Sequence, residues 1–148
     1  MLPKPPTLMP ITPRPQKPLP RGIRNNNPLN IRIGNVWLGE VNNPDDPEFE
    51  QFVSMKYGLR AAFVLLRRYI RHYHRTTIEA IIRAWAPPVE NSTDLYIANV
   101  SHTLGLLPSS EVDFSDKVLM CRLVQAMAKM ETGTVLDMKL IESAYDCA

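Results

Sequence analysis

The sequence predicts a mainly α-helical domain with a small β or loop element near its front, preceded by an extended, proline-rich arm. Three observations lead to this fold class. Apolar residues recur three and four positions apart over most of residues 57–145. Asparagine, glycine and proline gather between residues 21 and 47. Eight of the fourteen prolines lie in residues 1–20.

Residues 1–20 form the predicted arm, and residues 21–148 form the predicted domain. Proline lacks a backbone donor and favours the extended polyproline II conformation, so the arm is expected to form neither helix nor sheet. Two interpretations stay open for it. One is a disordered tail, and the other is a docking arm that lies along the surface of a partner.

The composition excludes several classes of protein. A chain of 148 residues with 45% apolar residues can bury the core of one domain. It has no run of about eighteen apolar residues and no apolar signal core, so neither a membrane span nor a secretory signal is expected. The net charge of +2 says little about partners. The basic segment RHYHR at residues 71–75 is interpreted as a solvated helix end, and no nucleic-acid partner is expected.

No metal site or cofactor is expected. Cys121 and Cys147 are too few for a disulfide framework, and Cys121 lies in a helical pattern where it is expected to pack as a small apolar residue. His72 and His74 are two positions apart and would point to different faces of a helix. The sequence contains no P-loop and no GxSxG, HExxH or CxxC motif.

The domain is expected to open with a structured loop and a small hairpin over RGIRNNNPLNIRIGNVWLGE, in which Ile31 and Ile33 alternate as in a strand. A second loop, NNPDDPEFEQF, follows at residues 42–52. Helices are then marked by their apolar spacing, by a capping box at residues 76–79 and by glycine stops. The five expected helices span residues 57–74, 76–86, 91–104, 115–131 and 134–145.

Glu131 is the first candidate for chemistry. In LVQAMAKMETG, Met120, Val124 and Met127 mark an apolar stripe, and Glu131 continues it just before Gly133. Desolvation raises the pKa of a carboxyl group, and a general acid that protonates a glycosidic oxygen needs such a raised pKa. The alternative is a helix-end glutamate exposed to water.

Four further residues are candidates for contacts with a sugar. Asn27 and Asn30 carry amides that can bind N-acetyl groups and hydroxyls, or can instead hold a tight loop together. Trp37 lies between two glycines, where an exposed indole can face a ligand. Tyr96 lies early on its helix and either lines a cleft or packs. Trp85, by contrast, continues an isoleucine stripe and is expected in the core.

No convincing second carboxylate is found. The acids of the second loop are expected to be mostly solvated, although one of them could face Glu131; they are Glu40, Asp45, Asp46, Glu48 and Glu50. Glu90 is either a site residue or an acid favoured at a helix start.

Five segments spread over residues 21–97 form a recognisable set: RGIRNNNPLNIR, WLG, FEQF, YGLRAA and WAPPVENSTDLYI. Together they resemble a family of small phage and prophage proteins that is lysozyme-like and directed at peptidoglycan. This resemblance covers residues 21–133 and implies a phage virion protein. Leu29 departs from the family pattern, which has glycine at that position.

The segment AMAKMETG at residues 126–133 resembles the helix that ends in the general acid of bacterial lytic transglycosylases and related glucosaminidases. The resemblance implies a lysozyme-like fold with Glu131 as the acid. In those enzymes this helix precedes the asparagine-containing loop and the tryptophan-glycine turn, whereas here it follows them. The order implies a circular permutation that would pack the helix beside residues 25–30, with Glu131 facing the same cleft as Trp37.

The resemblance implies a virion-associated protein that cleaves the glycan strands of peptidoglycan at the host cell wall. A single acid favours a lytic transglycosylase over a two-carboxylate hydrolase. Residues 1–20 would bind other virion proteins, which would carry the chain without a secretion signal. Two alternatives stay open: a non-catalytic structural virion protein that keeps a lysozyme-like fold and docks through its arm, and an endolysin that depends on a separate holin.

Overall fold

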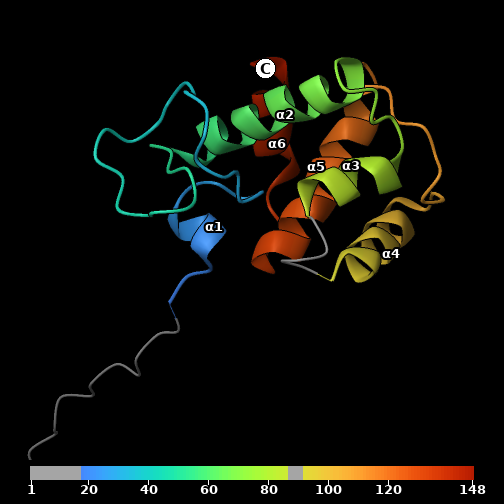
Figure 1. Ribbon diagram of the computed structural model, residues 1–148, viewed down its shortest axis with the longest axis horizontal. Coiled ribbons are helices and arrows are strands. Elements are labelled where there is room, and N and C mark those ends of the chain that lie inside the picture. The colour runs from blue at the N-terminus through green and yellow to red at the C-terminus, as the bar shows by residue number, and fades with distance from the viewer. Residues whose placement is uncertain (1–17, 87–91) are drawn as a thin grey trace, which may run out of the picture.

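The computed structural model describes residues 18–86 and 92–148. In this part of the chain α2 crosses the top of the molecule, α5 runs through its centre, and the front loops, residues 25–54, lie at one end (Figure 1). The predicted arm falls almost wholly on residues outside the description, and so does Glu90. The helices in chain order are α1 (Arg21–Arg24), α2 (Met55–Arg71), α3 (Ile78–Trp85), α4 (Thr93–Leu104), α5 (Lys117–Thr132) and α6 (Met138–Asp146).

The prediction of a mainly helical chain is confirmed, because α2–α6 correspond to the five expected helices. Their ends follow the expected chemistry. The Thr77 hydroxyl accepts a hydrogen bond from the Ala80 N–H, and the Asp116 carboxylate accepts one from the Leu119 N–H. Gly105 and Gly133 end α4 and α5 with left-handed φ angles of 68° and 73°.

The front of the chain differs from the expected hairpin. Ile31 is buried, whereas Ile33 is half exposed, so the alternation does not mark a strand with one buried face. Their backbones pair with Glu48 and Glu50 of the second loop rather than within a hairpin of residues 21–40. Asn30, with a φ of 51°, turns the chain just before Ile31. Only isolated antiparallel bridges form within residues 18–86 and 92–148: Arg32 with Phe49, Glu40 with Phe52, and Thr77 with Glu111. The short helix α1 was not predicted at all.

α5 is the central helix of the core. It packs against α4, α6 and α1, and α2 packs against α6. Met120, Leu123 and Met127 of α5 are fully buried. Cys121 is also buried with a free thiol, as its place in the apolar pattern predicted, and burial raises its pKa to about 11. None of the helices in the described residues is long and apolar enough to cross a membrane.

Two glycines let the front loops approach the helices. A Cβ at Gly58 of α2 would collide with the Asn26 carbonyl oxygen, so the loop backbone lies directly on the helix. A Cβ at Gly22 of α1 would lie 2.9 Å from the Asn27 carbonyl oxygen and 3.0 Å from the Thr132 methyl group of α5. The absence of side chains at these positions therefore brings the asparagine segment against both α2 and the end of α5.

Replacing Gly58 with alanine should lower the free energy of unfolding by about 1–3 kcal/mol or more, because backbone rather than a flexible side chain has to move. Chemical denaturation of the purified protein measures this change. Gly34→Ala is the matched control, since a Cβ at Gly34 meets no described heavy atom within 4 Å. Equal stability of the two variants would contradict the close packing.

Candidate functional site

A pocket of about 680 Å³ opens between the front of the chain and three helices. Residues 21–49 at the front of the chain supply most of the pocket wall, and α2 and α3 supply the opposite side. α5 contributes one residue, Glu131. The lining residues are Arg21, Leu29, Asn30, Ile31, Arg32, Ile33, Gly34, Asn35, Glu48 and Phe49 from the front, with Leu65, Tyr69, Ala84, Trp85 and Glu131 from the helices.

The structure brings Glu131 and Asn30 together across 101 positions of sequence. The Asn30 Nδ2 donates to Glu131 Oε1 at 3.5 Å, a long hydrogen bond. Glu131 is half-buried, one residue before the end of α5. Both residues line the pocket, so the expected meeting of the acid helix with the asparagine loop occurs in the fold.

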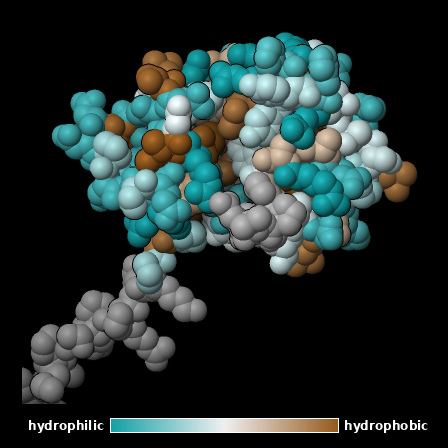
Figure 2. All heavy atoms as spheres, in the orientation of Figure 1, coloured by the Kyte–Doolittle hydropathy of each residue, from teal (hydrophilic) through white to brown (hydrophobic). Residues whose placement is uncertain are grey.

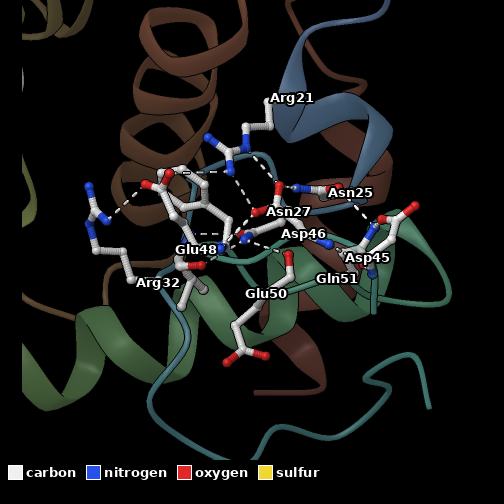
Figure 3. A network of polar contacts seen from close by, with 11 residues as sticks. Arg21, Asn25, Asn27, Arg32, Asp45, Asp46, Glu48, Glu50 and Gln51 are labelled. Carbon is white, nitrogen blue, oxygen red and sulfur yellow. Dashed lines mark hydrogen bonds and ion pairs between the residues drawn. The ribbon is translucent and has the colours of Figure 1, made fainter. Parts of the chain in front are cut away.

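Asp46 organises the loop wall of the pocket (Figure 3). The Arg21 Nε and Nη2 donate to its two carboxylate oxygens at 2.6 Å, and the Asn25 amide donates at 2.8 Å. The backbone N–H groups of Glu48 and Phe49 donate to it as well. Arg21 is the main cause that holds the pKa of Asp46 well below its usual range. Asp46 is only 8% exposed, so the expectation of a solvated acid is wrong for this residue.

Glu48 brings a second carboxylate to the pocket. Its oxygens lie 3.8 Å from Arg21 Nη2 and 3.5 Å from Arg32 Nη1. Both guanidinium groups also lie over the Phe49 ring, at 4.4 and 4.9 Å from its centroid. The result is a wall of two cations and an aromatic ring with one acid between them, which is suited to a polar, partly anionic ligand.

Asn27 is fully buried and is absent from the pocket lining. Its amide donates to the carbonyl oxygens of Ile31 and Glu50 at 2.9 and 3.0 Å, and its Oδ1 accepts from the Ile31 N–H. These three bonds satisfy the side chain and fix the path of the front loop. Asn27 thus lies behind the wall that Asn30 forms.

Of the two tryptophans, Trp37 departs from its predicted position and Trp85 takes a second role beside the predicted one. Trp37 is only 7% exposed, lies beneath the guanidinium of Arg68 and does not line the pocket. Trp85 does line it, with its Nε1–H donating to the Leu29 carbonyl at 2.8 Å and its ring 5.6 Å from that of Tyr69. The prediction of an exposed Trp37 is therefore wrong, whereas Trp85 packs against the core as predicted and also lines the pocket.

Tyr96 lies behind Glu131 rather than in the pocket wall. It is 3% exposed, and its hydroxyl donates to the Met127 carbonyl at 3.4 Å. Burial raises the pKa of Tyr96 well above its usual value, and the charge of Glu131 raises it further. The Tyr96 phenol is therefore held neutral close to this acid.

Two further carboxyl groups, those of Glu50 and Glu40, lie close together outside the pocket lining. Glu50 is 7% exposed, and desolvation raises its pKa to about 7, assisted by a hydrogen bond and charge from Glu40. Glu40 in turn accepts a hydrogen bond from the Trp37 N–H at 3.0 Å. Within the described ranges no cluster of three or more acid, histidine or cysteine side chains is arranged to hold a metal ion.

Several wall residues were not identified from the sequence. Arg32, Phe49 and Tyr69 line the pocket, and only the fold of the front loops reveals them. Arg32 and Phe49 lie in different loops and meet through their bridge, for which the sequence offers no periodic signal. The spacing of Tyr69 on an apolar helix face predicted a core residue rather than a pocket residue.

The fold and the site show a small helical protein with a polar pocket but do not identify its class. The comparison of its sequence with known proteins supplies that class, a phage protein. No protein-family model matches the chain. Over 118 residues it is 39% identical to Protein P5 of Pseudoalteromonas phage PM2, a match that covers 77% of this chain and 72% of that protein. The chain belongs to the family of this phage protein.

Glu50→Gln should remove a pH dependence of stability. The pKa of Glu50, about 7, lies above the ordinary value of roughly 4.3, so protonation stabilises the fold. This contribution is complete below about pH 4 and is lost as the pH rises through about 7. Glutamine stays neutral, so the variant should match the parent near pH 4 and exceed its stability near pH 8 by on the order of 1 kcal/mol.

Thermal unfolding measured from about pH 4 to about pH 8 tests this difference. Glu142→Gln removes an exposed carboxyl group on α6 and serves as the control, with a constant offset expected across the range. Parallel curves for Glu50→Gln and the parent would rule out a protonated Glu50.

Proposed function

We propose that the chain is a phage virion-associated protein that cleaves the glycan backbone of peptidoglycan as a lytic transglycosylase. Glu131 is its general acid, and Asn30 binds the substrate beside it. The observation that carries the proposal is the shared pocket of these two residues, which are 101 positions apart in the chain.

The placement of Glu131 supports its role as an acid. The carboxyl group projects from the end of a rigid, core-packed helix, and Tyr96 and Met127 lie behind it. A half-buried acid on a rigid element can be held at a fixed distance from a glycosidic oxygen. Gly133 then turns the chain away in the left-handed conformation and leaves one side of the acid open to the pocket.

The remaining wall supports a sugar ligand. Trp85, Tyr69 and Phe49 supply aromatic surface, on which the apolar face of a pyranose can stack. Asn30 and Arg32 supply donors for hydroxyl or N-acetyl oxygens. Asn27, Trp37 and Tyr96 contribute from behind the wall by fixing the segments that carry the contacting groups.

The single-acid route is favoured over two-carboxylate hydrolysis, even though Glu48 lies in the same pocket. Glu48 is already paired with Arg21 and Arg32, and more than half of its side chain is exposed. In a transglycosylase, Glu131 protonates the leaving glycosidic oxygen as its bond to the anomeric carbon breaks, with the N-acetyl group of the substrate able to assist. The 6-hydroxyl of the substrate then bonds to that carbon and gives its proton to the Glu131 carboxylate, so no second catalytic carboxylate is needed.

The phage origin of the relative supports the location in the particle. In this proposal residues 1–20 dock on other virion proteins, and the folded part acts on the wall of the host. The lysozyme-like fold and its permuted order belong to the same proposal.

Glu131→Gln should abolish clearing of peptidoglycan in a zymogram, with a rate at least about 10²-fold below that of the parent, because glutamine cannot donate the proton. Glu142→Gln is the matched control and should clear like the parent. Product analysis on purified sacculi identifies the reaction: 1,6-anhydro ends indicate a transglycosylase, and reducing ends indicate a hydrolase. Equal clearing by Glu131→Gln and the parent would remove Glu131 from the mechanism.

Asn30→Gly should lower the cleavage rate about tenfold while the fold is retained. Glycine tolerates the left-handed φ of 51° at this position but lacks the amide that reaches Glu131. Because this amide hydrogen-bonds to the carboxylate of the acid, the alkaline limb of the pH–rate profile, on which a general acid loses its proton, should also shift. Asn26→Gly is the control, since Asn26 also has a positive φ but donates to the Phe52 carbonyl away from Glu131. An unchanged pH profile for Asn30→Gly would argue against this contact.

The alternative is a non-catalytic structural virion protein that docks through residues 1–20. It predicts that neither the parent nor Glu131→Gln releases muropeptides from sacculi under any condition. Mass spectrometry of purified particles separates both functions from a free endolysin, which would be absent from particles.

A further inference from the structure

We propose that the exposed face of α2, together with the apolar side chains beside its first turn, is a docking surface for an anionic phospholipid bilayer. The inference is independent of the glycan-cleaving function. It rests on a row of cations without acids on one helix, and on exposed apolar side chains at the end of that row.

The cations follow the period of the helix. Lys56, Arg60, Arg67 and Arg71 are spaced by four, seven and four positions, which places them along one side of α2. Arg68 borders the same side, and α2 contains no acidic residue. The row is about 22 Å long at 1.5 Å per residue, enough to contact several lipid headgroups.

These cations are not neutralised by neighbouring acids. Within the described residues none of the five forms a salt bridge. Arg67 and Arg71 lie over the Phe114 ring instead, at 5.5 and 5.3 Å from its centroid. Arg60 also donates to the Cys147 carbonyl and Arg71 to the Ser115 hydroxyl. These partners are neutral, so the guanidinium groups are held in place and keep their full positive charge.

The apolar side chains border this row at the start of α2. Val36 is 95% exposed, and Leu38 and Val53 are each 60% exposed. Their segments are held together because the Val53 N–H donates to the Gly39 carbonyl at 2.9 Å. Figure 2 shows hydrophobic groups standing out among hydrophilic ones over the front loops, beside the mostly hydrophilic upper edge along which α2 runs.

Two contacts fix the apolar segment to the basic face. The Arg68 guanidinium lies 5.9 Å from the Trp37 ring, and Gly39 lies directly against the Tyr57 ring. Trp37 and Gly39 flank Leu38, and Tyr57 and Arg68 lie on the exposed side of α2. The exposed apolar side chains and the cations therefore belong to one continuous surface.

The combination favours a bilayer over a nucleic acid. Guanidinium and ammonium groups bind phosphate in either partner, but exposed valine and leucine side chains gain free energy only where hydrocarbon receives them. A surface for single-stranded nucleic acid would present several aromatic rings for the bases, whereas the most exposed apolar side chains here, Val36, Leu38 and Val53, are aliphatic and Tyr57 is only 37% exposed. The pocket is lined by Leu65 and Tyr69, on the other side of α2 from the basic row, so docking leaves it accessible.

Co-sedimentation of the full chain with vesicles tests the proposal. The protein should bind vesicles that contain phosphatidylglycerol, bind vesicles of pure phosphatidylcholine far more weakly, and lose affinity as salt is raised. Lys56→Gln combined with Arg71→Gln should weaken binding roughly 25-fold, since each charge near the surface contributes about fivefold. Val36→Ser combined with Leu38→Ser should weaken it by at least about fivefold at unchanged net charge.

The charge control combines Lys129→Gln with Lys139→Gln, which removes two exposed lysines of α5 and α6 and should leave affinity nearly unchanged. Circular dichroism verifies that every variant is folded. Equal losses in the control and in the α2 variant would overturn the proposal, as would equal binding to neutral vesicles. Binding unaffected by the serine substitutions, or binding to duplex DNA but not to vesicles, would also overturn it. None of these outcomes bears on release of muropeptides, so the two proposals fail separately.

Discussion

The carboxylate of Asp46 is the interaction on which the site depends. The front of the chain has almost no regular secondary structure, so its backbone polar groups need partners that helices and sheets do not supply. Asp46 accepts from Arg21, from Asn25 and from two backbone N–H groups of its own loop. Since Arg21 belongs to α1, one buried acid ties the first helix to the second loop. The pocket wall, including Glu48 and Phe49, is held in place by this cluster.

The helices were predictable from the sequence because their signals are local. Apolar spacing, the capping hydroxyl of Thr77, the capping carboxylate of Asp116 and the glycine after α5 each act within a few residues. The front loops were not predictable in the same way. Asn25, Asn27 and Asp46 are polar residues that the fold buries, and their partners lie up to 26 positions away. Composition alone assigns such residues to the surface.

The site was predictable in its main contact and not in its walls. The meeting of Glu131 with the asparagine segment followed from a resemblance in residue order rather than from any local pattern. The two tryptophans show the limit of local reasoning. Trp85 continues an apolar stripe but ends its helix where the pocket begins, and Trp37 lies in a loop that α2 covers through Arg68. Whether an aromatic ring faces a ligand depends on what packs over it, and that depends on the rest of the fold.

A buried polar core has consequences for stability that an apolar core lacks. The pKa of Asp46 is depressed, so its contribution is present above the unfolded value of about 3.9 and is lost as the pH falls. The pKa of Glu50 is raised to about 7, so its contribution is lost as the pH rises through that value. The same loop carries both groups, and their contributions to stability change with pH in opposite directions. The front of the chain is therefore most stable between roughly pH 4 and pH 7, the range in which Asp46 is ionised and Glu50 is protonated. Because these loops also form the wall around Glu131, the geometry of the pocket depends on two protonation states outside the proposed chemistry.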